Sequence, residues 1–199
     1  MSQTFMQAVK ERRTFYGLSK EQVVPDERIQ EIVEDAVNHS PSAFNSQSAR
    51  VVVLQGEQSD NLWNITKETL RKIVPAERFA ATEQKIDGFS KGSGTILFFE
   101  DQTVIEGLQK QFPSYGDNFS VWSNQSSAML QFVVWTALVQ EGLGASLQHY
   151  NPLIDEQVAT EWKLPAEWKL ITQMPFGKPT FAPGEKAFNP ITDKVKYFR

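Results

Sequence analysis

Two adjacent arginines and a threonine stand near the start of the chain, at Arg12, Arg13 and Thr14. A guanidinium group pairs with two phosphate oxygens at once, and a threonine hydroxyl adds a neutral donor. The group therefore suits a phosphate dianion. The alternative interpretation is a solvated helix end, because arginines at the C-terminus of a helix complement the helix dipole.

A second polar cluster occupies the ten residues from His39 to Ser48, directly before a short apolar run. The side-chain amides of Asn45 and Gln47 each offer donors and an acceptor, which suits the alternating carbonyl and N–H groups of a flavin pyrimidine ring. Ser42 adds a hydroxyl to the same cluster. The alternative is ordinary turn chemistry, which favours the same residue types.

A third group lies near the C-terminus, where Lys194 and Lys196 are two residues apart. In a strand this spacing places both ammonium groups on one face, whereas a charged tail is otherwise simply solvated. An acidic chain that gathers cations at its two ends and planar amides in one internal loop is consistent with a planar, phosphorylated cofactor.

The composition argues against several other kinds of chemistry. The chain has no cysteine and only two histidines, so it lacks a thiolate nucleophile, disulfides and the usual ligands of a transition metal. Its net charge of −4 argues against nucleic acid as a partner. No apolar stretch approaches the ~20 residues of a membrane span, and the polar start does not resemble a secretory signal. We therefore expect a cytoplasmic protein with neither nucleic-acid nor membrane partners.

The elements that position these clusters follow from the spacing of apolar residues. A chain of 199 residues predicts a single domain spanning 1–199. A helical pattern at the N-terminus holds Phe5, Met6 and Val9, and helical spacing also predicts helices over 26–39, 60–73, 77–89, 102–111, 117–141 and 155–162. Short β-branched or aromatic runs predict strands over 51–54, 95–99, 145–148, 169–174 and 195–198.

The order of these elements is irregular, which predicts an α+β fold rather than a regular βαβ succession. The glycine-rich stretch at 92–94 precedes a strand instead of following one, so a Rossmann nucleotide site is not supported. The predicted helix over 117–141 carries apolar residues on nearly every face of its second half. Such a helix must be buried on all sides, against the sheet or against a second subunit.

Taken together, these motifs resemble the FMN-dependent nitroreductase family over nearly the whole chain. The resemblance rests on Arg12-Arg13-Thr14, the loop 41–47, the segment 141–146 and the basic C-terminal pair. The short length and the string from Gly144 to Pro152 resemble its short subgroup, known from bacteria and from fungal fatty-acid-response proteins. The resemblance implies a sandwich in which helices flank a mostly antiparallel central sheet, and an intertwined homodimer with two FMN sites built from both chains.

The resemblance also implies contacts to the phosphate and the pyrimidine side of FMN. Five side chains would hold the ribityl phosphate: Arg12, Arg13, Thr14, Lys194 and Lys196. Ser42 and Asn45 would come from the partner subunit, and Gln47 would lie near the same interface.

Further contacts would surround the isoalloxazine ring. Backbone groups of Leu147, Gln148 and His149 would run along it, and Lys85 would stabilise negative charge near N1 and O2. Tyr16 stands where many members of the family carry a basic residue. Three aromatic residues are candidates for walls over the flavin, with core packing as the alternative: Phe112, Tyr115 and Trp122.

The activity implied is a transfer of two electrons from NAD(P)H through FMN to nitro compounds, quinones or similar small acceptors, by a ping-pong mechanism. The cofactor supplies the difficult chemistry, so the protein needs no nucleophile of its own. Three alternatives remain open: another flavin reaction such as dehydrogenation on the same fold, a non-catalytic flavin-binding redox sensor, and an interaction module without a cofactor. The sequence does not distinguish NADH from NADPH.

Overall fold

The most β-branched and aromatic runs of the chain form the centre of an open five-stranded sheet. In the computed structural model, which describes residues 4–199, strand β3 (Gly94–Asp101) lies between β2 (Ala49–Gln55) and β5 (Trp168–Pro179). Both pairings are antiparallel. The two-residue strands β1 (Leu18–Ser19) and β4 (Gly144–Ala145) pair with the C-terminal end of β5, and these pairings are also antiparallel.

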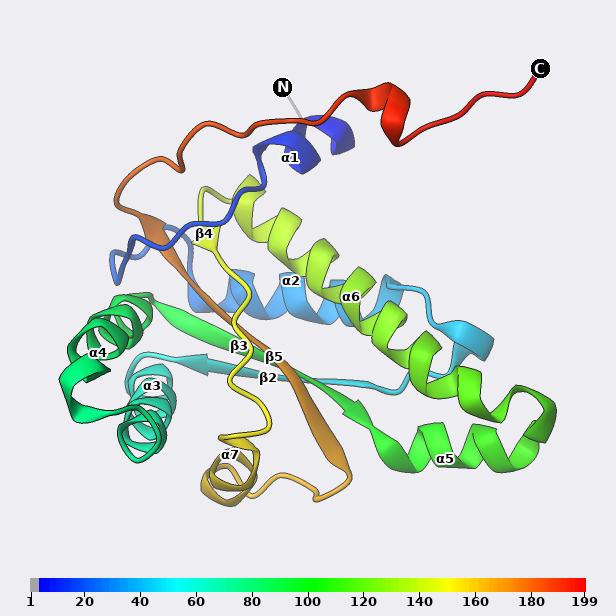
Figure 1. Ribbon diagram of the computed structural model, residues 1–199, viewed down its shortest axis with the longest axis horizontal. Helices are drawn as coiled ribbons and strands as arrows, with labels where there is room; N and C mark the ends of the chain where they lie inside the picture. Colours follow the sequence, from blue (N-terminus) through cyan, green and yellow to red (C-terminus); the bar gives the residue numbers. More distant parts are fainter. Residues whose placement is uncertain (1–3) are drawn as a thin grey trace.

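Helices cover both faces of this sheet, as Figure 1 shows. Side chains alternate along β3, so Ile96 and Phe98 point to one face while Leu97 and Phe99 point to the other. The first face is covered by α2 (Asp26–His39) and α6 (Gly116–Gln140). The second face is covered by α3 (Glu57–Arg71), α4 (Ala76–Ser90) and α7 (Asp155–Glu161).

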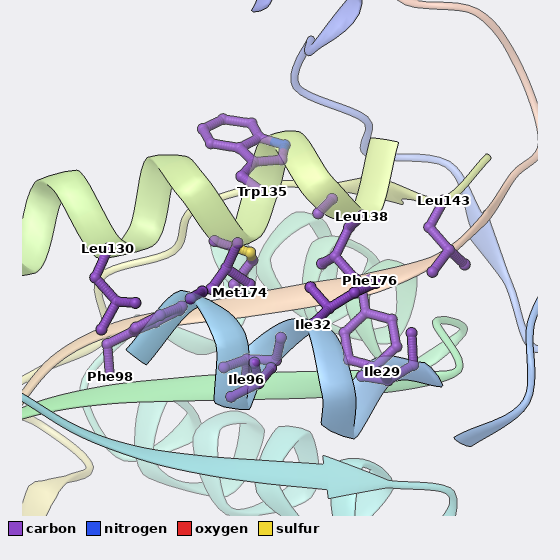
Figure 2. Close-up of a cluster of buried hydrophobic side chains, with 14 residues drawn as sticks. Ile29, Ile32, Ile96, Phe98, Leu130, Trp135, Leu138, Leu143, Met174 and Phe176 are labelled. Carbon is purple, nitrogen blue, oxygen red and sulfur yellow. The ribbon is translucent and has the colours of Figure 1, made fainter. Parts of the chain in front are cut away.

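The core between the sheet, α2 and α6 carries most of the elements that concern function. Figure 2 shows Leu130 of α6 beside Phe98 of the sheet, and Ile29 and Ile32 of α2 beside Phe176 of the sheet, within the same cluster. This packing fixes the second half of α6 against the sheet. A helix that is fixed in this way holds whatever lies at its two ends at a constant separation.

The remaining helices have clear local causes. Thr4 caps α1 (Phe5–Glu11) through its hydroxyl, and the Asp101 carboxylate caps α5 (Gln102–Gln111) by accepting from the Thr103 amide at 3.0 Å. Helix α2 ends at His39 because Pro41 follows Ser40, and a residue before proline disfavours the helical conformation. The helices predicted from the sequence are confirmed, and among residues 4–199 no helix is long and apolar enough to cross a membrane.

Two of the predicted strands are wrong in part or in whole. The strand predicted over 145–148 is reduced to Gly144–Ala145 and one isolated bridge between Gln148 and Gln173. The strand predicted over 195–198 does not form, because the chain there is exposed and follows a single 3-10 turn at Ile191–Asp193. Strand β1 was not predicted. The first three residues, part of the polar start considered above, lie outside the described range.

Glycine at position 177 is required by close packing of three backbone segments. A Cβ atom there would lie 2.6 Å from the Ser19 carbonyl oxygen and 2.9 Å from the Ser93 amide nitrogen. We expect Gly177→Ala to lower the free energy of unfolding by about 1–3 kcal/mol, because backbone atoms cannot rotate away. Urea denaturation measures this. The matched control is Gly107→Ala in α5, where nothing lies within 4 Å, and this variant should be up to about 1 kcal/mol more stable than the wild type. Equal stability of the wild type and Gly177→Ala would contradict the expectation.

Candidate functional site

The N-terminal arginines lie beside the segment that follows α6. After α1 the chain runs alongside β4, where Thr14 forms a parallel bridge with Ala145 and the Phe15 amide donates to the Ala145 carbonyl at 3.0 Å. Because the bridge is parallel, Arg12 and Arg13 lie toward Leu143 and Gly144, shortly before the 147–149 segment. The predicted phosphate group and the predicted ring-binding segment therefore follow one another along the same stretch of chain.

The arginine pair, Arg12 and Arg13, has no carboxylate partner among residues 4–199. The Arg12 guanidinium lies over the Trp135 ring, 4.2 Å from its centroid, and its Nε is buried with no hydrogen-bond partner in the described part of the chain. Burial, and secondarily the charge of Arg13, lowers the pKa of Arg12. Two neighbouring guanidinium groups that lack a counter-ion fit a phosphate dianion, which would neutralise both and satisfy the buried Nε.

The 147–149 segment is anchored to the sheet through its middle residue. The Gln148 amide donates to the Gln173 carbonyl at 2.8 Å and the Gln173 amide returns the bond at 2.9 Å. The Gln148 side chain is buried and donates to the Ser146 hydroxyl at 3.1 Å. Because neighbouring residues in a strand turn their backbone groups to opposite sides, those of Leu147 and His149 face away from β5.

Helix α4 contributes a cation on the same side of the molecule. The Lys85 ammonium lies 5.8 Å from the Phe89 ring centroid, and the Tyr16 ring contacts Phe89 with centroids 6.5 Å apart. Tyr16 lies three residues after Arg13 in the chain. Lys85 is therefore linked to the N-terminal segment through two aromatic rings.

The C-terminal lysines lie in an exposed tail that follows β5 and passes over α1 (Figure 1). Arg13 donates to the Gly184 carbonyl at 2.7 Å, which ties the tail to the arginine pair. Lys196 donates to the Thr192 carbonyl at 2.8 Å. Within residues 4–199 no hydrogen bond or ion pair joins Lys194 or Lys196 to the arginines.

The loop of residues 42–48 lies at the opposite end of α6. Phe44 stacks on Trp122 in the first half of that helix, whereas Arg12 lies on Trp135 in the second half. At 1.5 Å per residue these two points are about 20 Å apart along the helix axis. Ser42, Asn45 and Gln47 therefore do not meet the arginine pair within one chain.

The 42–48 loop has an unusual backbone. Phe44, Asn45 and Gln47 have φ of 57°, 50° and 48°, the left-handed region that side chains other than glycine and asparagine rarely adopt. Such a conformation persists only where surrounding contacts enforce it, and it is most common at functional sites. Here the Gln47 amide donates to the Ser42 hydroxyl at 3.1 Å, and Arg50 donates to the Gln47 carbonyl at 2.8 Å.

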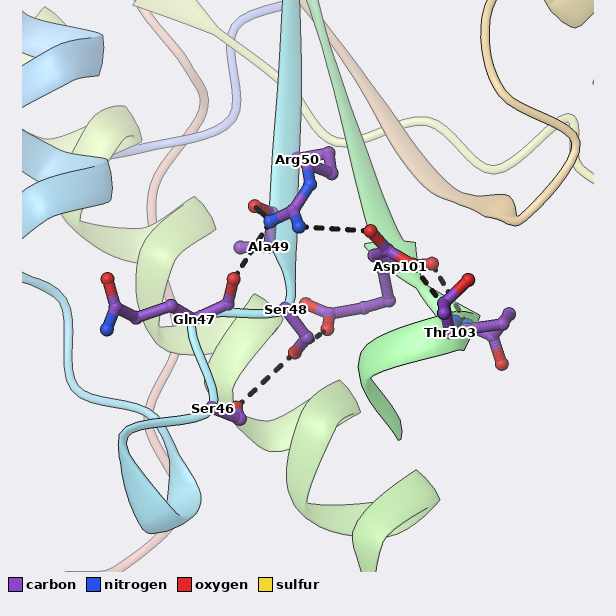
Figure 3. A network of polar contacts seen from close by, with 9 residues as sticks. Ser46, Gln47, Ser48, Ala49, Arg50, Asp101 and Thr103 are labelled. Atoms are coloured by element: carbon purple, nitrogen blue, oxygen red, sulfur yellow. Dashed lines mark hydrogen bonds and ion pairs between the residues drawn. The ribbon is translucent and has the colours of Figure 1, made fainter. Parts of the chain in front are cut away.

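Beneath the loop lies a buried carboxyl group, that of Glu100 at the end of β3. Ser48 Oγ is 2.5 Å from Glu100 Oε2, while Oε1 is buried with no hydrogen-bond partner among the described residues. Burial raises the pKa of Glu100 to about 7, against the opposing effects of the Ser48 hydrogen bond and the Arg50 charge. Figure 3 shows Ser46 beside Ser48, and the ion pair of Arg50 with Asp101.

An aromatic cluster surrounds Phe44 at this end of α6. Four rings lie 5.1–6.2 Å from the Phe44 ring, centroid to centroid: Phe112, Tyr115, Phe119 and Trp122. An open hollow of about 420 Å³ lies beside it, lined by Phe44, Trp122 and Met129 among others. A more polar hollow of about 430 Å³ lies on the other side of the loop, lined by Ser42, Asn45 and Gln47 among others.

The predicted aromatic residues Phe112, Tyr115 and Trp122 are thus brought together. Sequence reasoning missed Phe44 and Phe119, which belong to the same cluster. The position of Phe44 between Ser42 and Asn45 was a usable signal, because a large ring within a polar loop needs a partner to cover it.

Comparisons of the sequence and of the structure with known proteins all identify nitroreductases. Residues 9–178 match the model of the nitroreductase family. The chain is 34% identical over 199 residues to the nitroreductase HBN1 of Saccharomyces cerevisiae, covering 98% of this chain and 97% of that protein. The structure of nitroreductase CinD from Lactococcus lactis with chloramphenicol superposes with a TM-score of 0.91 at 45% identity, covering 98% of this chain and 100% of that one. The CinD structure with 4-nitrophenol gives a TM-score of 0.90 at 46% identity and the same coverage.

The buried carboxyl of Glu100 predicts how stability depends on pH. Folding raises its pKa from 4.5 to about 7, so the folded protein binds this proton more tightly than the unfolded chain. Its contribution is fully present below pH about 4.5 and is lost as the pH rises through about 7, a change of up to about 3 kcal/mol. Urea denaturation between pH 4.5 and 8 measures it.

The variant Glu100→Gln should lose this part of the pH dependence, since the amide does not titrate. The control Glu106→Gln, an exposed residue of α5, should follow the wild type. Parallel stability curves for the wild type and Glu100→Gln would show that Glu100 does not titrate in this range.

Proposed function

Because the chain belongs to the nitroreductase family and is an oxidoreductase of nitroreductase type, we propose that it binds FMN and transfers two electrons from NAD(P)H to a nitro compound, quinone or similar small acceptor. The observation that carries the FMN assignment is the arginine pair, which lies beside β4 and has no counter-ion among residues 4–199. NAD(P)H and the acceptor would bind in turn at one open face of the flavin, which is a ping-pong mechanism.

The residues that would hold the cofactor follow from this placement. Arg12, Arg13 and Thr14 would bind the ribityl phosphate, with Lys194 and Lys196 supplied by a tail that adjusts when the phosphate is present. The outward backbone groups of Leu147 and His149 would lie along the ring system. The bound flavin would supply the hydride acceptor and donor, and the protein would supply binding, orientation and charge.

Lys85 would place a positive charge where the reduced ring carries its negative charge. Its ammonium lies over Phe89, so the aromatic ring limits where the side chain can go. The exposed end of Lys85 remains free to reach toward a ring bound beside Tyr16.

We further propose that two copies of the chain form one site. Val121, Met129 and Val133 make an exposed apolar stripe along α6, and Phe5 of α1 is 68% exposed. Exposed apolar surface of this kind usually marks an interface. A homodimer that buries this stripe would bring the 42–48 loop of one copy to the arginine pair of the other, which a single chain cannot do.

The aromatic cluster at the start of α6 is proposed as the acceptor site. Its rings offer planar, apolar surfaces on which a flat aromatic acceptor can stack. CinD, which shares this fold, is seen with chloramphenicol and with 4-nitrophenol. The exposed edge of Phe44, which is 53% accessible, makes it the first ring that such an acceptor would meet.

The first test is the visible spectrum of the freshly purified protein. We expect flavin absorbance, and we expect anaerobic NADH or NADPH to bleach it, because a bound ring must accept the hydride. Repeated turnover of a nitroaromatic compound or a quinone should follow. A colourless protein that gains no colour with added FMN would remove the proposal, and slow reduction without turnover would favour the redox sensor.

Substitutions test the phosphate site. Arg12→Ala and Lys194→Ala should each weaken FMN binding by about 1.5–3 kcal/mol, the scale of a hydrogen bond to a charged group. Titration followed by flavin fluorescence measures this. The control Lys110→Ala, an exposed cation at the end of α5, should bind FMN as the wild type does. If both site variants keep wild-type affinity, the phosphate does not lie here.

A further inference from the structure

Glu100 fastens the 42–48 loop to the sheet. Along β3 it follows Ile96 and Phe98 on the face covered by α6, and the residue is only 1% exposed. Its carboxyl group lies 2.5 Å from the Ser48 hydroxyl. The backbone is tied at the same point, because the Asp101 amide donates to the Ser48 carbonyl at 2.9 Å.

Burial of the Glu100 carboxyl group favours its protonated form, although the hydrogen bond from Ser48 favours the ionised form. An ionised carboxylate would keep one buried oxygen, Oε1, without a donor among the described residues. A carboxylic acid can instead donate its proton to Ser48 Oγ, which leaves the Ser48 hydroxyl free to donate toward Ser46 Oγ, 3.5 Å away. The proton on Glu100 thus sets the direction of a short chain of hydrogen bonds that leads into the loop (Figure 3).

The charged groups near Glu100 leave this preference in place. Arg50 favours the ionised form and Asp101 opposes it, while these two residues are paired with each other at 3.0 Å. Lys169 of β5 is the backbone partner of Glu100 in the sheet, and its side chain is exposed. The residues of α5 and α6 that share the space around Ser48 are uncharged: Ile105, Leu108, Ser123, Ser126 and Leu130. Burial therefore dominates, and it raises the pKa of Glu100 to about 7.

The loop needs such an anchor because its backbone is strained. Three of its residues hold left-handed φ angles, and two of these, Phe44 and Gln47, are types for which this conformation is costly. Water can reach an ionised Glu100 only if Ser48 moves away from it, and this movement would leave the Arg50 bond to the Gln47 carbonyl and the ring contacts of Phe44 to hold the loop. Ser42, Asn45 and Gln47 would then leave the positions in which they face outward.

From this geometry we propose that Glu100 is a positioning residue, which in its protonated form holds the 42–48 loop in shape and on losing its proton releases it. The effect on FMN rests on the proposed function, in which the loop contacts the cofactor of the partner copy. The effect on the loop itself does not.

Hydrogen–deuterium exchange of peptides covering 41–48, measured on the FMN-loaded protein and corrected for the intrinsic pH dependence of exchange, tests the proposal. Protection of the loop in the wild type should fall about tenfold or more between pH 5.5 and 8.5, because each unit of pKa difference is a factor of ten in the opening equilibrium. Glu100→Gln should keep the low-pH protection at both values, since its amide can donate to Ser48 as the acid does. Ser48→Ala should remove the pH dependence, and the control Glu106→Gln should retain it.

The dissociation constant of FMN, measured by fluorescence at the same two pH values, provides the second readout. It should rise with pH in the wild type and stay nearly constant in Glu100→Gln. Loop protection that is flat with pH in the wild type, or that titrates equally in Glu100→Gln, overturns the proposal even when FMN is bound. A protein that shows the expected loop behaviour but binds no FMN keeps the positioning role and loses the proposed function. If Glu100→Gln does not fold, the proposal is tested by the pH midpoint of loop protection in the wild type and by the loss of that pH dependence in Ser48→Ala.

Discussion

The length of α6 is the constraint on which the proposed site depends. One end of this helix supports the arginine pair through Trp135, and the other end supports the 42–48 loop through Trp122. The packing of α6 against α2 and the sheet fixes the two ends about 20 Å apart, too far for one mononucleotide ring to touch both. Either the two groups serve separate purposes or a second copy supplies the missing half. The apolar stripe that α6 leaves exposed favours the second possibility.

Both halves of the site hold features that are unfavourable in the isolated chain. Arg12 keeps a positive charge in a partly buried place, with no anion beside it among the described residues. The 42–48 loop keeps non-glycine residues in the left-handed region. A phosphorylated, planar ligand would relieve the first by pairing with the guanidinium, and it would use the second by finding amide groups already in position. Preorganisation of this kind reduces the entropy that binding would otherwise cost.

Local patterns carried most of the sequence prediction. Helices such as α2 and α5 were predicted closely, because apolar spacing and capping residues act within a few positions. Strand β1 is only two residues long and exists through its pairing with β5, so no local signal marks it. The left-handed backbone at Phe44 and Gln47 has no compositional signal either, since both residue types are ordinary elsewhere. In the sequence, Glu100 is simply the polar residue at the end of an apolar strand. Only the fold shows that it is buried and in contact with Ser48.

The surroundings of Tyr16 explain why a tyrosine suits this position, where many members of the family carry a basic residue. Tyr16 contacts the ring of Phe89, and the ammonium of Lys85 lies near the same ring. A cation on the N-terminal segment would face Lys85 across one aromatic residue, and two like charges at that separation would disfavour each other. A tyrosine leaves a single positive charge in this region and adds a flat surface beside it. In the proposed site, positive charge at the pyrimidine end of the flavin would then come from helix α4, whose position is fixed by Phe79 and Ile86 in the second core, rather than from an extended strand.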